Sequence, residues 1–161
     1  METLSFDLLQ FLYHLALAIL VGGSLVLGTA VAPVLFASSR SRAEAGTLFG
    51  NVLARFDGLA IFSVIVLTVT SVFKALGFEV TGAPDTRLVL RWVALAALAV
   101  AILYSSAWAN PVARQIRAAT PGFDEQPQSS PARIEFAKLH GRSRRAMSVA
   151  VVFGLLALFL G

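Results

Sequence analysis

The sequence contains no cysteine and has few other side chains suited to binding soft metals or to catalysis. Its 161 residues include two histidines and two methionines, and only 14% of the residues are charged. The lack of cysteine excludes disulfides, thiolate metal sites and thiol catalysis. There is also no phosphate-binding glycine loop, no HExxH and no Ser-His-Asp arrangement. We therefore do not expect an enzyme.

Apolar residues dominate what remains. They form 57% of the chain, and the mean hydropathy is +0.79, well above that of a soluble globular domain. The uncharged stretch 8–39 is longer than the about 20 residues that a helix needs to cross a bilayer. In such a chain the net charge of +4 is a topology signal and does not indicate nucleic-acid binding. The expected partner is the lipid bilayer.

The hydropathy pattern predicts an all-α fold, a four-helix transmembrane bundle that forms one membrane domain. The expected spans are about 8–36, 51–76, 88–113 and 140–160. Pro33 and Pro111 are expected to kink or end the first and third spans. Residues 120–131, rich in Pro, Ser, Gly and acidic side chains, predict a flexible loop. Pro131 is typical of the first position of the helix that follows.

The distribution of Lys and Arg predicts the orientation in the membrane. Ten of these residues flank the first and third connections, namely Arg40, Arg42, Arg55, Arg114, Arg117, Arg133, Lys138, Arg142, Arg144 and Arg145. Three flank the second connection, namely Lys74, Arg87 and Arg91. Because basic residues are enriched on the cytoplasmic side, both termini are expected outside the cytoplasm.

Polar residues from three spans are expected at the cytoplasmic end of the bundle. The candidate binding residues are Arg55, Asp57, Trp108, Asn110, His140 and Arg144. Polar groups at that depth are costly unless they are paired or hydrated. We therefore expect Asp57, Asn110 and His140 to point toward one another around a small cavity. The alternative is that these residues only fix helix ends at the membrane boundary.

His14 is the one ionisable residue inside the first span, and such residues are often functional. It could instead be a neutral imidazole that is hydrogen-bonded between helices. A functional His14 is expected to face the bundle interior, on the stripe formed by Ala18, Val21, Leu25 and Gly28. His140 is expected at the other side of the membrane. The two histidines are therefore not expected to bridge one metal ion or one haem within a protomer.

Three blocks of sequence resemble the transmembrane protein 205-like family of small four-helix membrane proteins. The blocks are Tyr13-His14-Leu15 leading through Gly22-Gly23 to Ala32-Pro33-Val34-Leu35-Phe36, then Ala107-Trp108-Ala109-Asn110-Pro111, then Phe136-Ala137-Lys138-Leu139-His140-Gly141-Arg142-Ser143. The function of this family is poorly defined. The resemblance implies a role in transport or in handling metal complexes, although the soft sulfur ligands that suit such metals are limited here to Met1 and Met147.

Three function classes follow from these observations. The first is a transporter-like membrane protein that handles small molecules or metal complexes, expected to be a homo-oligomer because four spans enclose little space. The second is a haem- or transition-metal-binding redox or assembly protein, for which His14 followed by Gly22-Gly23 is the only support. The third is a structural membrane subunit that acts through partners.

Overall fold

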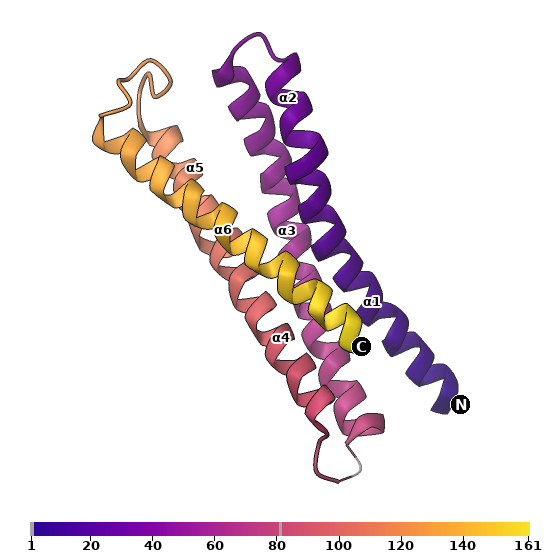
Figure 1. Ribbon diagram of the computed structural model, residues 1–161. Helices are drawn as coiled ribbons and strands as arrows, with labels where there is room; N and C mark the ends of the chain where they lie inside the picture. The colour runs from indigo at the N-terminus through magenta and orange to yellow at the C-terminus, as the bar shows by residue number, and fades with distance from the viewer. Residues whose placement is uncertain (1, 81) are drawn as a thin grey trace.

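A computed structural model describes residues 2–80 and 82–161, with side chains from residue 4 onward. Over these residues the chain is all-helical and contains no β-strand. It forms a four-helix bundle of long rods, and both termini lie at the end that carries the connection between the second and third rods (Figure 1). Each rod is long and apolar enough to cross a membrane. This is the architecture of a multi-pass membrane protein.

Three of the four rods combine α-helix with a short π-helical segment. The first consists of α1 (Glu2–Val26), η1 (Leu27–Val31) and α2 (Ala32–Ser38), and the second of α3 (Arg42–Lys74) and η2 (Ala75–Glu79). The third consists of α4 (Thr86–Ile102), η3 (Leu103–Ala109) and α5 (Asn110–Ala119), and the fourth is α6 (Pro131–Leu160). The rods are longer than the expected spans, because the helices continue for further residues, many of them polar, at every boundary except the end of the fourth span.

The two prolines inside rods follow directly after π-helical segments. Pro33 comes two residues after η1, and Pro111 comes two residues after η3. A proline ring clashes with the carbonyl four residues earlier, at Thr29 and at Ala107, and both of these lie in the π segments. The wider π turn accommodates the ring, so each rod continues through its proline and does not end there.

Local signals in the sequence fix the starts of α3 and α4. The hydroxyl of Ser41 accepts a hydrogen bond from the Glu44 backbone N–H at 3.1 Å, and the Glu44 carboxylate accepts one from the Arg40 backbone N–H at 2.9 Å. Asp85 caps α4 by accepting from the Leu88 N–H at 2.7 Å. These bonds satisfy backbone donors that the first turn of a helix leaves free.

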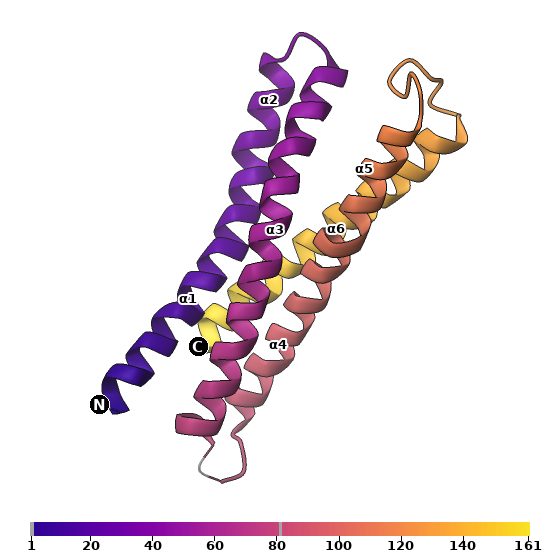
Figure 2. The ribbon, with the colours of Figure 1, turned by 180° about the vertical axis from the view of Figure 1, so that it is seen from behind.

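The rods pack in two pairs. α1 lies beside α3, α4 lies beside α6, and α6 crosses toward α1 near its C-terminal end (Figures 1 and 2). Gly154 permits this crossing, because a Cβ there would lie 2.4 Å from Val21 Cγ2 and 3.0 Å from Leu98 Cδ1. The core between the pairs is apolar and includes Leu17, Leu20, Val64, Leu67, Leu98, Ile102 and Ala150.

Residues 120–131, for which composition predicts a flexible loop, fold as a series of turns against α5 and α6. Phe123 is 6% exposed, and its ring lies 5.1 Å from that of Phe136 on α6. The Arg133 guanidinium lies over the Phe123 ring and donates to the backbone oxygens of Phe123 and Asp124. A single buried aromatic side chain therefore anchors a segment that is otherwise polar.

Candidate functional site

The main polar feature inside the bundle is Asp57 on α3, which is 3% exposed. Its Oδ1 accepts a hydrogen bond from Asn110 Nδ2 at 2.8 Å, and its Oδ2 accepts from the Arg114 guanidinium at 2.6 Å. The Arg114 side chain is 36% exposed, so this ion pair has one buried partner and one that reaches the surface. Asn110 and Arg114 are four residues apart on α5, hence on one helix face, and can bind the same carboxylate.

Two serines extend this arrangement to the fourth rod. Ser143 on α6 donates to Asn110 Oδ1 at 2.5 Å, and Ser105 on η3 lies 2.7 Å from the Ser143 hydroxyl. A hydroxyl has one proton to donate, and that of Ser143 goes to Asn110. Ser105 is therefore the donor to Ser143. Asn110 lies at the centre of the network, with its amide group toward Asp57 and its oxygen toward Ser143.

We call these five residues the Asp57 network: Asp57, Ser105, Asn110, Arg114 and Ser143. They join α3, η3, α5 and α6, which are distant in sequence. Since Asn110 directly follows η3, the π turn and the proline after it set the direction in which this amide points. Each of its carboxylate oxygens and each polar atom of its amide already has one partner within the protein.

Ser63 and Ser106 are two further buried serines whose hydroxyls have no hydrogen-bond partner among the described residues. Ser63 on α3 is 2% exposed and Ser106 on η3 is 2% exposed, and the Oγ of each is buried. A serine in a helix commonly donates to the carbonyl four residues earlier, as Ser24 and Ser148 do here. An unpaired buried hydroxyl costs about 1–3 kcal/mol. Ser106, which directly follows Ser105, and Ser63, six residues after Asp57 on α3, therefore each provide an unused hydrogen-bonding group.

Of the candidate residues derived from sequence, the structure brings Asp57 and Asn110 together and leaves the other four elsewhere. Arg55, Trp108, His140 and Arg144 are exposed, and none has a recorded bond to the network among the described residues. His140 stacks on Phe136, with ring centroids 6.0 Å apart, and Trp108 lies against Tyr104. The expected convergence of His140 with Asp57 and Asn110 is therefore wrong.

Helix geometry explains the error at His140. The face of α6 that packs into the bundle carries Leu139 and Ser143, both buried and four residues apart. His140 and Arg144 are each one residue further along, which rotates them by about 100° to the outside. Ser143 ends the third block of sequence that carries the family resemblance. The prediction favoured its neighbours His140 and Arg144, because they belong to a basic cluster at the membrane boundary. Arg114 could have been inferred from its spacing to Asn110.

His14 does not belong to the Asp57 network. It is half-buried, and its Nδ1 lies 2.9 Å from the backbone oxygen of Gln10 on the same helix. The stripe expected to face the interior is wrong in large part, because Ala18, Leu25 and Gly28 are exposed. The buried face of α1 is instead formed by Tyr13, Ala16, Leu17, Leu20 and Leu27.

Potential metal ligands do not gather in the part of the chain that the structure describes. No group of three or more His, Cys, Asp or Glu side chains occurs there with a spacing that could hold a metal ion. The Asp57 network contributes one carboxylate, and its other members are donors or neutral groups. The network is therefore built from hydrogen bonds and one ion pair.

Comparison with protein families gives one match. A family model described as a domain of unknown function (DUF4149) matches residues 15–121, well over half of the chain. The matched region includes Asp57, Ser105, Asn110 and Arg114, and it ends before α6 with Ser143. No curated protein and no solved structure gives a significant match.

Proposed function

Because the chain belongs to the DUF4149 family, whose description names no activity, we propose from its site that it is a transporter-like membrane protein. The Asp57 network is the place where a small polar solute binds. By the distribution of basic residues, this end of the bundle faces the cytoplasm. The observation that carries the proposal is the burial of Asp57 in a hydrogen-bonded network whose members come from the second, third and fourth rods.

An ionisable side chain inside a membrane span is uncommon and generally serves function. Asp57 is held by two partners, yet each carboxylate oxygen can accept more than one hydrogen bond. A solute with N–H or O–H groups can therefore bind Asp57 while Arg114, which is partly exposed, turns toward the boundary. The free hydroxyls of Ser63 and Ser106 supply further partners for such a solute.

The interrupted third span supports the same function. Transporters commonly place their binding sites at discontinuous helices, because irregular backbone exposes polar groups that line a cavity. The π segment η3 runs from Leu103 to Ala109 and carries both Ser105 and Ser106. π segments inside helices occur frequently at functional sites. A π segment that carries two buried serines, one of them a member of the Asp57 network, supports a binding function at this position.

The other functions considered from sequence receive less support. A structural subunit remains the alternative, because a network of paired polar groups also holds helices together. No contact favours metal complexes, haem or a transition metal, and none is part of this proposal. The likeness to the transmembrane protein 205-like family and the formation of a homo-oligomer remain predictions.

Chemical labelling of a single cysteine tests whether water-soluble molecules reach the network. The chain has no native cysteine, so Ser106→Cys introduces a unique thiol at a buried residue outside the five bonded ones. In proteoliposomes we expect it to react with the membrane-impermeant reagent 2-sulfonatoethyl methanethiosulfonate. Ala150→Cys, which is 3% exposed in the apolar core, is the matched control. If Ser106→Cys reacts no faster than Ala150→Cys, the network is sealed and the structural alternative holds.

A further inference from the structure

A second charged cluster lies at the opposite end of the bundle. Lys74 at the end of α3 is 1% exposed, and Arg91 on α4 is 6% exposed. Both pair with Glu79 on η2, Lys74 through its Nζ at 3.3 Å from Oε1 and Arg91 through its guanidinium to Oε2. Tyr13 on α1 completes the cluster, because Lys74 Nζ lies 4.5 Å from the centroid of its ring. Four polar or aromatic groups from three rods therefore meet at this end.

This cluster carries an excess positive charge. With Lys74 and Arg91 both protonated, two cations face one carboxylate, which gives a formal net charge of +1 in a buried position. The nearby Asp85 is already engaged as the N-cap of α4, and Asp7 on α1 is exposed. The Tyr13 ring offsets part of the cost through cation–π contact. The buried Nε of Arg91 still has no hydrogen-bond partner. An anion beside Arg91 would satisfy both the charge and this donor.

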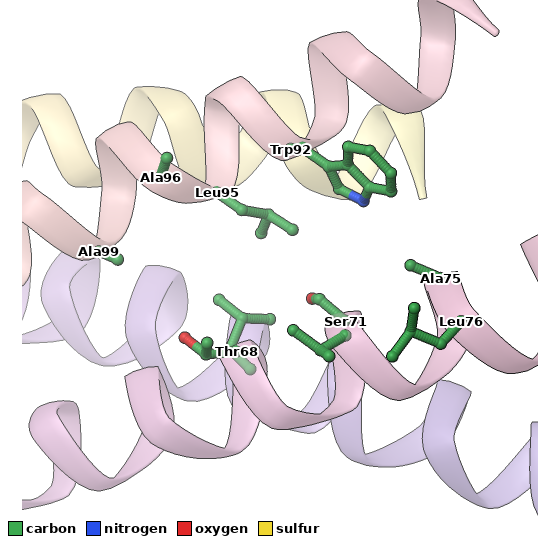
Figure 3. A pocket seen from close by; sticks show the side chains of 10 residues that line it. Thr68, Ser71, Ala75, Leu76, Trp92, Leu95, Ala96 and Ala99 are labelled. Atoms are coloured by element: carbon green, nitrogen blue, oxygen red, sulfur yellow. The ribbon is translucent and has the colours of Figure 1, made fainter. Parts of the chain in front are cut away.

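An apolar groove lies between the second and third rods, and its wall begins one residue after Lys74 on the second and one residue after Arg91 on the third. It encloses about 430 Å³ and is lined on α3 by Leu67, Thr68, Ser71 and Val72, on η2 by Ala75 and Leu76, and on α4 by Trp92, Leu95, Ala96 and Ala99. Figure 3 shows the Ser71 hydroxyl and the Trp92 indole turned into the space between the two helices. The Ser71 Oγ is buried and has no partner. The groove is thus apolar along its length, with one free hydroxyl.

The charged cluster and the apolar groove correspond to the two parts of a lipid, its headgroup and its acyl chain. Lys74 directly precedes Ala75 in the groove wall, and Arg91 directly precedes Trp92. From Leu76 to Leu67 the groove runs about 13 Å along α3, close to the about 15 Å of one leaflet of hydrocarbon. Ser71 lies about 4.5 Å deeper than Lys74 along the helix axis. A hydroxyl at that depth can donate a hydrogen bond to the ester carbonyl of a phospholipid whose phosphate lies at the level of Lys74.

We propose that this groove binds one anionic phospholipid, with its phosphate at Lys74 and Arg91 and an acyl chain along α3 and α4. Charge complementarity selects the headgroup, because a net anionic lipid neutralises the excess charge, whereas a zwitterionic lipid does not. Glu79, which is 16% exposed, pairs with both cations and keeps them oriented. This site is independent of the solute site at the Asp57 network.

Native mass spectrometry of the full chain in detergent tests the proposal, with dioleoylphosphatidylglycerol and dioleoylphosphatidylcholine as probes. We expect one phosphatidylglycerol to be retained about tenfold more strongly than phosphatidylcholine, and Arg91→Gln to remove that preference. Arg87→Gln is the matched control, since Arg87 is an exposed cation on the same helix one turn earlier. Diffuse attraction to the basic end would be weakened equally by both changes, and that result would overturn the proposal.

A groove-filling variant separates a lipid from a free anion and leaves the cations intact. Ala96 is exposed and lines the groove, so Ala96→Phe is expected to fold normally and to reduce phosphatidylglycerol retention about tenfold. Inorganic phosphate and glycerol 3-phosphate, which lack acyl chains, are expected not to compete at millimolar concentration. Competition by either one, with retention unchanged in Ala96→Phe, would assign the site to a free anion and contradict a lipid.

Discussion

Asn110 Nδ2 donates to Asp57 Oδ1 over 2.8 Å, although 53 residues separate the two side chains in the sequence. This bond joins the second rod to the third at the point where the third changes from π- to α-helix. It also fixes the orientation of the amide, so that its oxygen is left to accept from Ser143. One amide therefore connects a buried carboxylate to the fourth rod.

Removing the Asp57 carboxylate is expected to destabilise the bundle by about 2–3 kcal/mol. Asp57→Ala leaves the buried amide of Asn110 without its acceptor, whereas Arg114 can turn to the membrane boundary because it is partly exposed. Unfolding in mixed micelles, followed by helical content, measures the loss. The control is Asp124→Asn, which breaks the exposed pair with Arg117 at 2.7 Å and should cost less than about 1 kcal/mol. Equal losses of stability in the two variants would show that the buried Asp57 carboxylate contributes no more than the exposed Asp124.

The hydrogen bond from Ser143 is expected to contribute about 1 kcal/mol, in line with bonds between membrane helices. Ser143→Ala removes the donor to Asn110 and the acceptor for Ser105. Ser148→Ala on the same helix is the control, since the Ser148 hydroxyl only donates to its own helix at Arg144. A double-mutant cycle of Ser143→Ala with Asn110→Ala should give a coupling of about 0.5–1 kcal/mol. Additive effects would show that the bond does not form.

Close helix packing predicts opposite effects at two glycines. Gly154→Ala would place a methyl group against Val21 and Leu98, and we expect a cost of about 1–3 kcal/mol from overpacking. Gly22→Ala meets nothing within 4 Å and should stabilise α1 slightly, because alanine favours a helix. Thermal unfolding in detergent compares them. If Gly154→Ala is neutral, α6 does not cross α1 as closely as described.

Membrane topology is tested at two exposed connections. The ten-to-three distribution of basic residues predicts that Ser38, at the end of α2, faces the cytoplasm and that Ala83, before α4, faces outside. Cysteines placed singly at these positions should react with an impermeant maleimide from opposite faces of oriented vesicles. Reaction of both from the same face would contradict the four-span arrangement.

The sequence predicted the fold far better than the site. The uncharged stretches 8–39 and 92–113 are long enough to cross a bilayer, and the apolar stretches 58–73 and 146–161, flanked by charged residues, indicated the other two spans, so the four rods followed from length and hydropathy. The site depended on helix rotation, which one residue changes by about 100°. The sequence therefore indicates that His140 lies near the depth of Asp57 and Asn110, but it does not show which face of α6 points inward. The inner face carries Ser143, and His140 points outward. The buried Phe123 was missed because the loop around it is polar in composition.

The side of the membrane from which the network is reached tests the central proposal most directly. A transporter must expose its site to each side in turn, whereas a structural tie or a one-sided receptor does not. The measurement is the rate at which Ser106→Cys reacts with 2-sulfonatoethyl methanethiosulfonate added separately to the two faces of oriented vesicles. We predict reaction from both faces, each faster than in Ala150→Cys. Reaction from the cytoplasmic face alone, or from neither, would contradict transport through the Asp57 network.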